Sequence, residues 1–226
     1  MTVTCQNRIS QESVIGVQGS TLEISNSSIN DCQSNADGGF IQSYDNAVVT
    51  VDSCNFSNLH SNGLGGAIAS LGSNLSISHS SFSNCSSNGG GGAVWSSELQ
   101  ACFGSLQIYN TSLLIKSSKF IECSTRGSGG AVLADSSESS QAGEVLDVRI
   151  VSSQFSKCNA ATEGGAFRAS GGRLQAIVVF SEFEFSIAGS LGGAVSAGEF
   201  CSLSLVSCKM LLPLLPTYHL YQPYFW

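Results

Sequence analysis

Charged residues are scarce in this chain of 226 residues, at 11% against about 25% in an average soluble domain. Proline is scarce as well, because only Pro213, Pro216 and Pro223 occur. The formal net charge is −7, and no cluster of Lys and Arg offsets it. This balance argues against a nucleic-acid partner, which requires a basic surface. We interpret the acidity as a property of a solvated surface.

Three common signals are also missing. The nine cysteines contain no C-x-x-C pair and the three histidines are scattered, so we expect no metal site and no cofactor. The apolar runs are too short for a membrane-spanning helix. The first residues, Met1 to Cys5, lack the basic start and apolar segment of a signal peptide. We interpret the chain as a fragment of a larger protein.

What the sequence does contain is a repeat, in which an apolar anchor precedes a Gly-Gly pair by nine positions. The first Gly of each pair follows the previous one by 27, 26, 38, 35 and 28 residues. Such a period marks an architecture in which each unit buries its apolar face against its neighbours. The anchors are Ile29, Phe56, Phe82, Phe120, Phe155 and Phe183, and the pairs are Gly38-Gly39, Gly65-Gly66, Gly91-Gly92, Gly129-Gly130, Gly164-Gly165 and Gly192-Gly193.

The pattern inside each unit predicts strands. Segments such as 75–77 (Leu-Ser-Ile) and 148–150 (Val-Arg-Ile) alternate apolar and polar residues at strand period. We find no apolar stripe of helical period. Short strands and glycine bends in a coil of roughly 26–28 residues predict an all-β fold, a right-handed parallel β-helix of about seven coils. We expect residues 1–20 to be an imperfect first coil or N-terminal cap, 21–210 the repeats, and 211–226 an apolar C-terminal tail.

Stacking of equivalent residues at about 4.8 Å predicts an inward ladder of the five Phe anchors. Met210 is the anchor that we expect in a seventh unit. Glycine reaches backbone conformations that strain other residues. The Gly-Gly pairs therefore suit a tight bend at which the backbone packs close to the core.

The repeat resembles that of the chlamydial polymorphic outer membrane proteins, which carry GGA-[ILV] and FxxN motifs on a pectin-lyase-like β-helix. Segments 65–68, 91–94, 129–132 and 192–195 match the first motif. The second is altered, because its Asn position holds Cys32, Leu59, Cys85, Cys123, Cys158 or Ser186. The resemblance covers about residues 20 to 210. It implies a surface-exposed passenger used in adhesion, although the C-terminal barrel that exports such passengers is not in this chain. A related repeat in a eukaryotic surface or secreted protein fits equally well.

Cysteines recur at one repeat position, three residues after the anchor. Stacking places neighbours among Cys85, Cys123 and Cys158 about one strand spacing apart, within disulfide range by distance. We favour a ladder of small buried thiols, because free cysteine packs like a small hydrophobe. At most one pair of these three can form a disulfide.

Five segments match the N-x-[ST] acceptor for N-glycosylation. Such matches arise by chance in a chain rich in Ser and Asn, and they matter only if a eukaryote secretes the protein. The acceptor residues are Asn26, Asn55, Asn74, Asn84 and Asn110.

The alternative function is a polysaccharide-acting enzyme, a lyase or glycoside hydrolase of the pectin-lyase-like kind, since β-helices also host such enzymes. That chemistry requires carboxylates on adjacent coils. The outward row of the main strand reads Glu23, Thr50, Ser76, Leu114, Arg149, Ile177 and Ser204, without acidic neighbours. Asp147 with Arg149 is the nearest approach to a site, and we interpret it as a pair of exposed strand charges. We assign no catalytic residue.

The last residues depart from the repeat. Leucines and prolines at 211–216 lead into an aromatic end that includes Tyr221 and Trp226. The tail is interpreted as a cap on the open solenoid end, a truncated membrane-proximal segment, or out-of-frame sequence. As a cap, we expect it to cover Ile177 and Val179. Two insertions, near 96–104 and 135–143, are candidate binding loops.

Together these patterns predict a non-catalytic surface or secreted module, an adhesin or a structural spacer. We expect a partner at the cell surface, a protein or a glycan, and an extracellular or cell-surface location. No residue of the sequence identifies the adhesive site.

Overall fold

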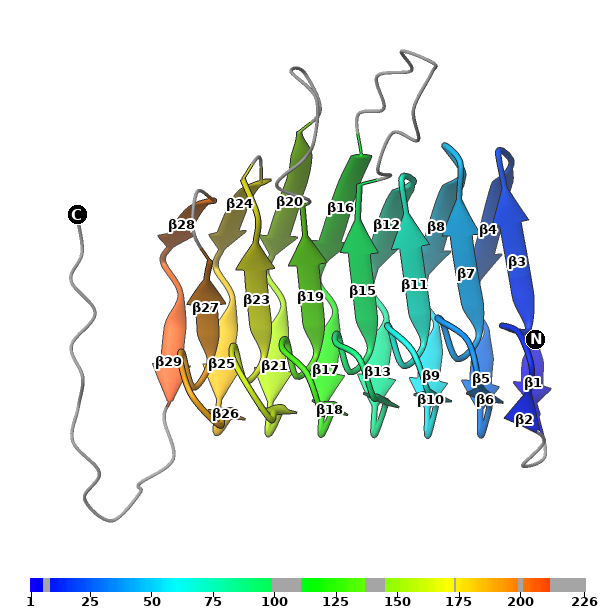
Figure 1. The fold of residues 1–226 in the computed structure, drawn as a ribbon, viewed down its shortest axis with the longest axis horizontal. Helices are drawn as coiled ribbons and strands as arrows, with labels where there is room; N and C mark the ends of the chain where they lie inside the picture. The colour runs from blue at the N-terminus through cyan, green and yellow to red at the C-terminus, as the bar shows by residue number, and fades with distance from the viewer. Residues whose placement is uncertain (6–8, 99–110, 137–144, 173, 199–200, 212–226) are drawn as a thin grey trace.

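A computed structural model describes residues 1–5, 9–98, 111–136, 145–172, 174–198 and 201–211. Over these ranges the chain is all β, with 29 short strands and no helix. The strands form four sheets, here called A to D, and every pairing between strands is parallel. The successive coils stack along one axis (Figure 1).

Each coil contributes one strand to each sheet in the order A, B, C, D. Sheet A holds β1 (Thr2–Thr4), β5 (Ser28–Asn30), β9 (Asn55–Ser57), β13 (Ser81–Ser83), β17 (Lys119–Ile121), β21 (Gln154–Ser156), β25 (Glu182–Glu184) and β29 (Lys209–Leu211). Sheet B holds β2 (Ile9–Ser10), β6 (Gln33–Ser34), β10 (His60–Ser61), β14 (Ser86–Ser87), β18 (Ser124–Thr125), β22 (Asn159–Ala160) and β26 (Ile187–Ala188). Sheet C holds β3 (Ile15–Gln18), β7 (Ile41–Tyr44), β11 (Ile68–Leu71), β15 (Val94–Ser97), β19 (Val132–Asp135), β23 (Phe167–Ser170) and β27 (Val195–Ala197). Sheet D holds β4 (Thr21–Ser25), β8 (Val48–Asp52), β12 (Asn74–Ser78), β16 (Thr111–Lys116), β20 (Leu146–Val151), β24 (Leu174–Val179) and β28 (Ser202–Val206).

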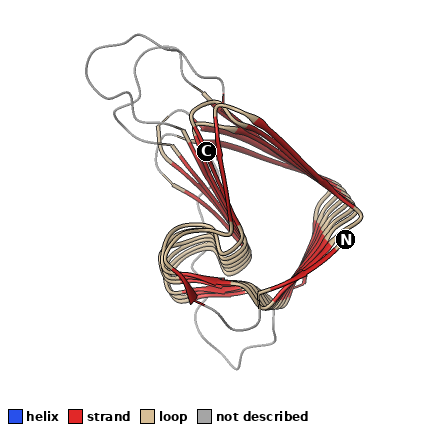
Figure 2. Cartoon of the chain, turned by 90° about the vertical axis from the view of Figure 1, so that its right-hand side faces the viewer, coloured by secondary structure: helices blue, strands red, loops and turns tan. Residues whose placement is uncertain are grey.

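The chain is a right-handed parallel β-helix, as the repeat predicts. Seen from the N-terminal end, the chain runs clockwise as it moves away from the viewer (Figure 2). The pairing register agrees with the repeat, since Leu75 and Ile77 lie level with Leu113 and Ile115 in the next coil. Met210 lies level with Phe183, as expected of a seventh anchor.

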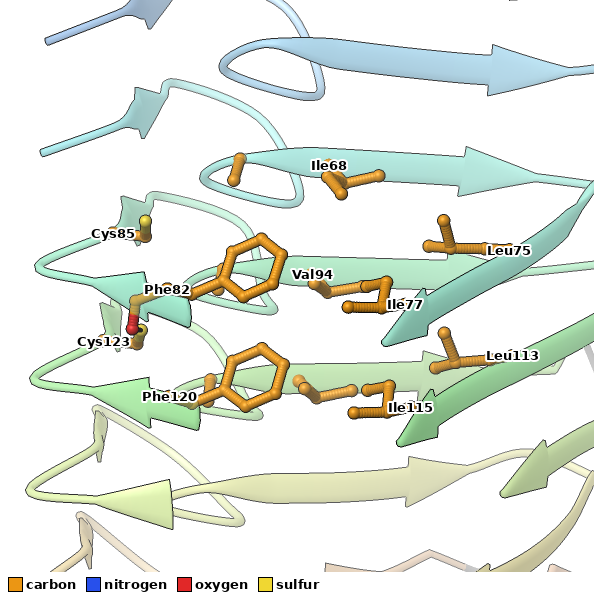
Figure 3. Packing of buried hydrophobic residues seen from close by; sticks show 14 of the residues in the cluster. Ile68, Leu75, Ile77, Phe82, Cys85, Val94, Leu113, Ile115, Phe120 and Cys123 are labelled. Carbon is orange, nitrogen blue, oxygen red and sulfur yellow. Dashed lines mark hydrogen bonds between the residues drawn. The ribbon is translucent and has the colours of Figure 1, made fainter. Parts of the chain in front are cut away.

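The core fills the interior because the inward residues of sheets A and D are chiefly apolar, whereas the short strands of sheet B turn Ser34, Ser61 and Ser87 inward. In β12, Leu75 and Ile77 are buried and the residues between and beside them are half-exposed. Period-two alternation turns every second side chain inward, and the unchanged register repeats this choice in each coil. The buried side chains of consecutive coils stack in rows (Figure 3).

The Gly-Gly pairs form the bend between sheets B and C. The first glycine is left-handed, with φ of 63° at Gly91, a conformation that strains other residues. The second lies against the neighbouring coil, where a Cβ on Gly92 would lie 2.0 Å from the Gly130 carbonyl oxygen. The same left-handed φ recurs at Gly38, Gly65, Gly129, Gly164 and Gly192, and the same clash at Gly39, Gly66, Gly130 and Gly165.

The corners on either side of sheet A are sharp because one residue at each adopts left-handed φ. Between sheets D and A these residues are Asn26, Ser53, His79, Ser117, Ser152, Phe180 and Ser207. Between sheets A and B they are Asp31, Asn58, Asn84, Glu122, Lys157 and Phe185. Small polar residues tolerate this conformation best, so the long side chains of Glu122 and Lys157 and the rings of Phe180 and Phe185 are exceptions.

The strands of the first coil follow the same pairing as the later coils. Strand β1 pairs with β5, and β3 pairs with β7, so residues 1–20 include strands of a first coil. The tail expected over Ile177 and Val179 begins at Leu211, and its remainder lies outside the described residues. Ile177 is exposed and Val179 is half-buried. Within the described ranges, no helix could cross a membrane.

Candidate functional site

The five Phe anchors form one continuous stack inside the solenoid. Neighbouring ring centroids from Phe56 to Phe183 are 4.7–4.9 Å apart, and the rings are within 7° of parallel. All five rings are fully buried. The anchors are therefore structural residues, and no ligand can reach them without opening a coil.

The acceptor asparagines that the structure describes lie on the outside of the coils. Asn26, Asn55 and Asn84 are exposed, Asn74 is half-buried, and Asn110 lies outside the described residues. The Asn74 side-chain oxygen accepts a hydrogen bond from Ser112 Oγ at 2.8 Å. Exposure makes three of the five acceptors accessible to a glycosylating enzyme.

The disulfide of the structure joins the first two coils. Cys5 and Cys32 are bonded across 27 residues. Cys85, Cys123 and Cys158 are buried free thiols, as the thiol-ladder interpretation expects. The pKa of Cys123 is raised by burial, and that of Cys158 by its contact with Cys123 and by burial. These thiols are therefore poor nucleophiles.

A second inward row, which the sequence analysis missed, is a serine ladder at the corner between sheets D and A. The backbone N–H of Ser80 donates to Ser118 Oγ at 3.2 Å, and that of Ser118 to Ser153 Oγ at 3.3 Å. Each hydroxyl donates in turn to the carbonyl two residues earlier, as Ser80 does to Ser78 at 2.7 Å. Cys54 occupies the same position one coil earlier, where its N–H donates to Ser80 Oγ. The sequence carries a signal for this row, because each of these serines stands two residues before its Phe anchor.

The candidate binding site is a groove on the outer face of sheet C, near the N-terminal end. It encloses about 450 Å³, within the range of small-ligand sites. Strands β7, β11 and β15 form its floor, and Glu12 and Asp37 lie on the turns beside it. The lining residues are Glu12, Asp37, Gln42, Ser43, Tyr44, Asp45, Ala69, Leu71 and Trp95.

The apolar part of this groove is anchored by Trp95. The indole packs in a cluster with Ala69 and Leu133 on the outer face of sheet C, and only 9% of the residue is exposed. Leu64 and Leu71 pack against the same cluster. The floor is therefore rigid, because its side chains are held by neighbours on three adjacent coils.

Two of the three carboxylates in the groove already serve the fold. Asp37 Oδ1 accepts a hydrogen bond from the Leu64 backbone N–H at 2.7 Å, and Asp45 Oδ2 accepts one from Gln18 Nε2 at 2.7 Å. Over the described part of the chain, no hydrogen bond involves the side chains of Glu12, Gln42 or Tyr44. These three side chains are available to a ligand.

The signs of charge around the groove are uniform. Its described lining carries the three carboxylates and no Lys or Arg. Carboxylates without a cation repel an anionic ligand and suit a neutral or cationic one. The geometry thus offers an aromatic floor, an amide, a phenol and a free carboxylate, which is a polar–apolar combination suited to binding.

Other carboxylates on the solenoid are held in local contacts. Hydrogen bonds from Ser78, His79 and Ser53 lower the pKa of Asp52 to about 2. Asp147 pairs with Arg149 at 3.1 Å on the exposed face of β20. On sheet C, Arg168 pairs with Glu163 and donates to Ser196 Oγ at 2.9 Å. In the described ranges, no three His, Cys, Asp or Glu side chains converge to hold a metal.

Residues 99–104 and 137–143, which make up most of the two insertions, lie outside the described residues. Residues 96–97 and 135, expected in the insertions, are instead the ends of β15 and β19. Both insertions depart from the corner between sheets C and D, since one lies between β15 and β16 and the other between β19 and β20. They remain candidate binding loops by sequence alone, and the groove does not depend on them for any residue named above.

Comparison with known proteins adds no relative. No protein-family model, no curated protein and no solved structure matches this chain.

Proposed function

We propose that this chain is a non-catalytic β-helical module of a surface or secreted protein, and that it acts in adhesion. The observation that carries the proposal is the groove on sheet C, whose floor is fixed by Trp95 and whose Gln42, Tyr44 and Glu12 side chains are free. A preorganised site requires little ordering when it binds. The solenoid then serves as the rigid spacer that presents this site.

A glycan with neutral or amino sugars suits the groove best. Sugar rings pack an apolar face on aromatic side chains, and their hydroxyls pair with amides and carboxylates. The uniform negative charge of the lining disfavours uronic acids and sulfated sugars. This charge also argues against pectin as a ligand.

An extracellular or cell-surface location follows from the same proposal. The Cys5–Cys32 disulfide suits an oxidising compartment. The exposed acceptors Asn26, Asn55 and Asn84 suit secretion by a eukaryote, and the GGA-[ILV] resemblance to chlamydial passengers suits a bacterial surface. Adhesion is common to both settings.

Binding to oligosaccharide panels tests the proposal. We expect the protein to bind neutral or amino-sugar oligomers and to ignore polygalacturonate. Tyr44→Ala and Gln42→Ala should weaken binding at least tenfold with unchanged circular dichroism. Leu114→Ser, on the outer face of sheet D and 37% exposed, is the matched control and should bind as the parent does. Equal binding by all three variants would remove the groove from the proposal.

A second candidate function is a polysaccharide-acting enzyme, and one observation favours it. Three carboxylates, from Glu12, Asp37 and Asp45, line a single groove, and glycoside hydrolysis uses a pair of carboxylates. Release of reducing ends from a neutral polysaccharide, abolished by Glu12→Gln, would favour the enzyme. Binding without release, in the same assay, favours adhesion.

A further inference from the structure

The inward face of sheet C carries three hydroxyls without a partner among the described residues. Ser43 in β7, Ser70 in β11 and Ser96 in β15 lie level with one another and are fully buried. Within the described ranges, no hydrogen bond reaches the side-chain oxygen of any of the three. A buried hydroxyl without a partner loses its hydration and gains nothing in return, so native folds rarely contain one. Three in one row therefore require an explanation.

Serines in other inward rows do have partners. In sheet B, Ser61 Oγ donates to the Leu64 carbonyl at 3.1 Å, and Ser87 Oγ donates to the Gly90 carbonyl at 3.0 Å. In the serine ladder at the corner between sheets D and A, each hydroxyl donates to the carbonyl two residues earlier, as Ser118 does at 2.8 Å. The row of sheet C is therefore singled out by its unpaired hydroxyls and not by serine as such.

The hydroxyls occupy three consecutive coils of this row. The coils on either side carry apolar residues at the level position, namely Val17, Ala134, Ala169 and Ala197. The three serines belong to β7, β11 and β15, whose outer faces form the floor of the groove. The row is thus a local feature beneath the groove, bounded at both ends by apolar side chains.

The corner between sheets C and D contains smaller side chains in these coils. At the inward position where sheet D begins, the second and third coils carry Ala47 and Ser73, whereas the fifth and sixth carry Leu146 and Leu174. Even with the oxygen of the unpaired serine counted, the second and third coils place fewer side-chain atoms in this corner. The fourth coil carries Thr111 there, which is buried and whose hydroxyl also has no partner among the described residues. A polar interior site with such a deficit of side-chain atoms suits water.

We propose that Ser43, Ser70 and Ser96 bind a file of ordered water inside this corner, with one water between each neighbouring pair of serines. Level oxygens of stacked strands are about 4.8 Å apart, which is too far for a direct hydrogen bond. One water about 2.8 Å from each oxygen spans this distance at a near-tetrahedral angle. A buried water makes about three hydrogen bonds, and the hydroxyls of Ser73 and Thr111 supply further partners. Ser73 Oγ donates to the Leu71 carbonyl at 3.1 Å and still accepts a bond through its lone pairs.

Thermal melts of two variants of the full chain test the proposal, because hydrated and unpaired hydroxyls predict opposite shifts. With water bound, Ser70→Ala removes a partner from the waters on both sides and should lower Tm. With an unpaired hydroxyl, the same variant removes a buried polar group at no loss and raises Tm. Ala134→Ser is the matched control, because it adds a hydroxyl to the same row beside Leu146, where the corner is filled, and it should lower Tm. A raised or unchanged Tm in either variant would refute the proposal.

Electron density in crystals of the full chain locates the water directly. We expect one peak within hydrogen-bond distance of both Ser43 Oγ and Ser70 Oγ, and a second peak between Ser70 Oγ and Ser96 Oγ. Ala134 and Ala169, which lie level in the same row, are the internal control and should have no peak between them. Density that shows the three serines with nothing between them would overturn the proposal, whatever the melts give.

Discussion

Removal of one ring from the middle of the aromatic stack tests the architecture most directly. Phe120 is fully buried, with ring centroids of Phe82 and Phe155 at 4.9 and 4.8 Å. Emptying a buried Phe site costs about 3–5 kcal/mol, and each stacked pair adds about 0.5–1.5 kcal/mol. We expect Phe120→Ala to lower the free energy of unfolding by about 5 kcal/mol.

Phe183→Ala is the informative comparison for this prediction. Phe183 is equally buried but stacks on one ring only, that of Phe155, because Met210 lies level with it in the next coil. We expect its loss to be smaller by about 1 kcal/mol, the worth of one stacked pair. Urea unfolding followed by circular dichroism measures both, provided that the m-value is unchanged. A loss under about 1 kcal/mol at Phe120 would place that ring outside the core.

Three further predictions concern the bends, the disulfide and one carboxylate. Gly92→Ala places a Cβ against a neighbouring carbonyl and should lower the free energy of unfolding by about 1–3 kcal/mol. Gly16→Ala places a Cβ with no atom within 4 Å and should change the stability little. Thermal melts compare the two variants. Cys32→Ser removes the disulfide that closes a 27-residue loop and should lower the free energy of unfolding by about 3.5 kcal/mol, from the loop entropy. Cys54→Ser, in the serine ladder, should leave the free energy of unfolding nearly unchanged. Urea unfolding measures both. The pKa of Asp52 is about 2 in the fold and 3.8 without it, so its stabilising effect is complete above pH 4 and is lost as pH falls through 2. Asp52→Asn should remove that dependence, and an unchanged acid limb would contradict the cause assigned here.

The fold could be predicted from the sequence because the coils of a β-helix repeat one pattern of residues at a regular interval. One anchor, one apolar pair and one Gly-Gly pair recur at fixed offsets, so the register of all seven coils follows from any two. The strand boundaries follow too, since Phe82 and Ile77 are inward residues by the same alternation that the sequence displays.

The groove and the disulfide could not be predicted in this way. Gln42 and Trp95 occupy one repeat position, level with Ala69 on the outer face of sheet C, but the residue type at that position changes from coil to coil. Glu12 lies on a turn, outside any strand of the repeat. Cys5 pairs with Cys32 although the two residues sit at different offsets from their anchors. A periodic pattern specifies what is equal between coils, whereas a binding site depends on what differs.

The one-dimensional order of the coils has a consequence for how such a protein changes in length. Because each coil touches only the coils before and after it, duplication of a segment between two Gly-Gly pairs outside the groove, such as residues 164–191, keeps the repeat in register at both junctions. The product is longer by one rung, about 4.8 Å, with the groove and the far end chemically unaltered. Recombination between equivalent glycines can therefore adjust the distance between the two ends in discrete steps while leaving the surfaces at those ends intact.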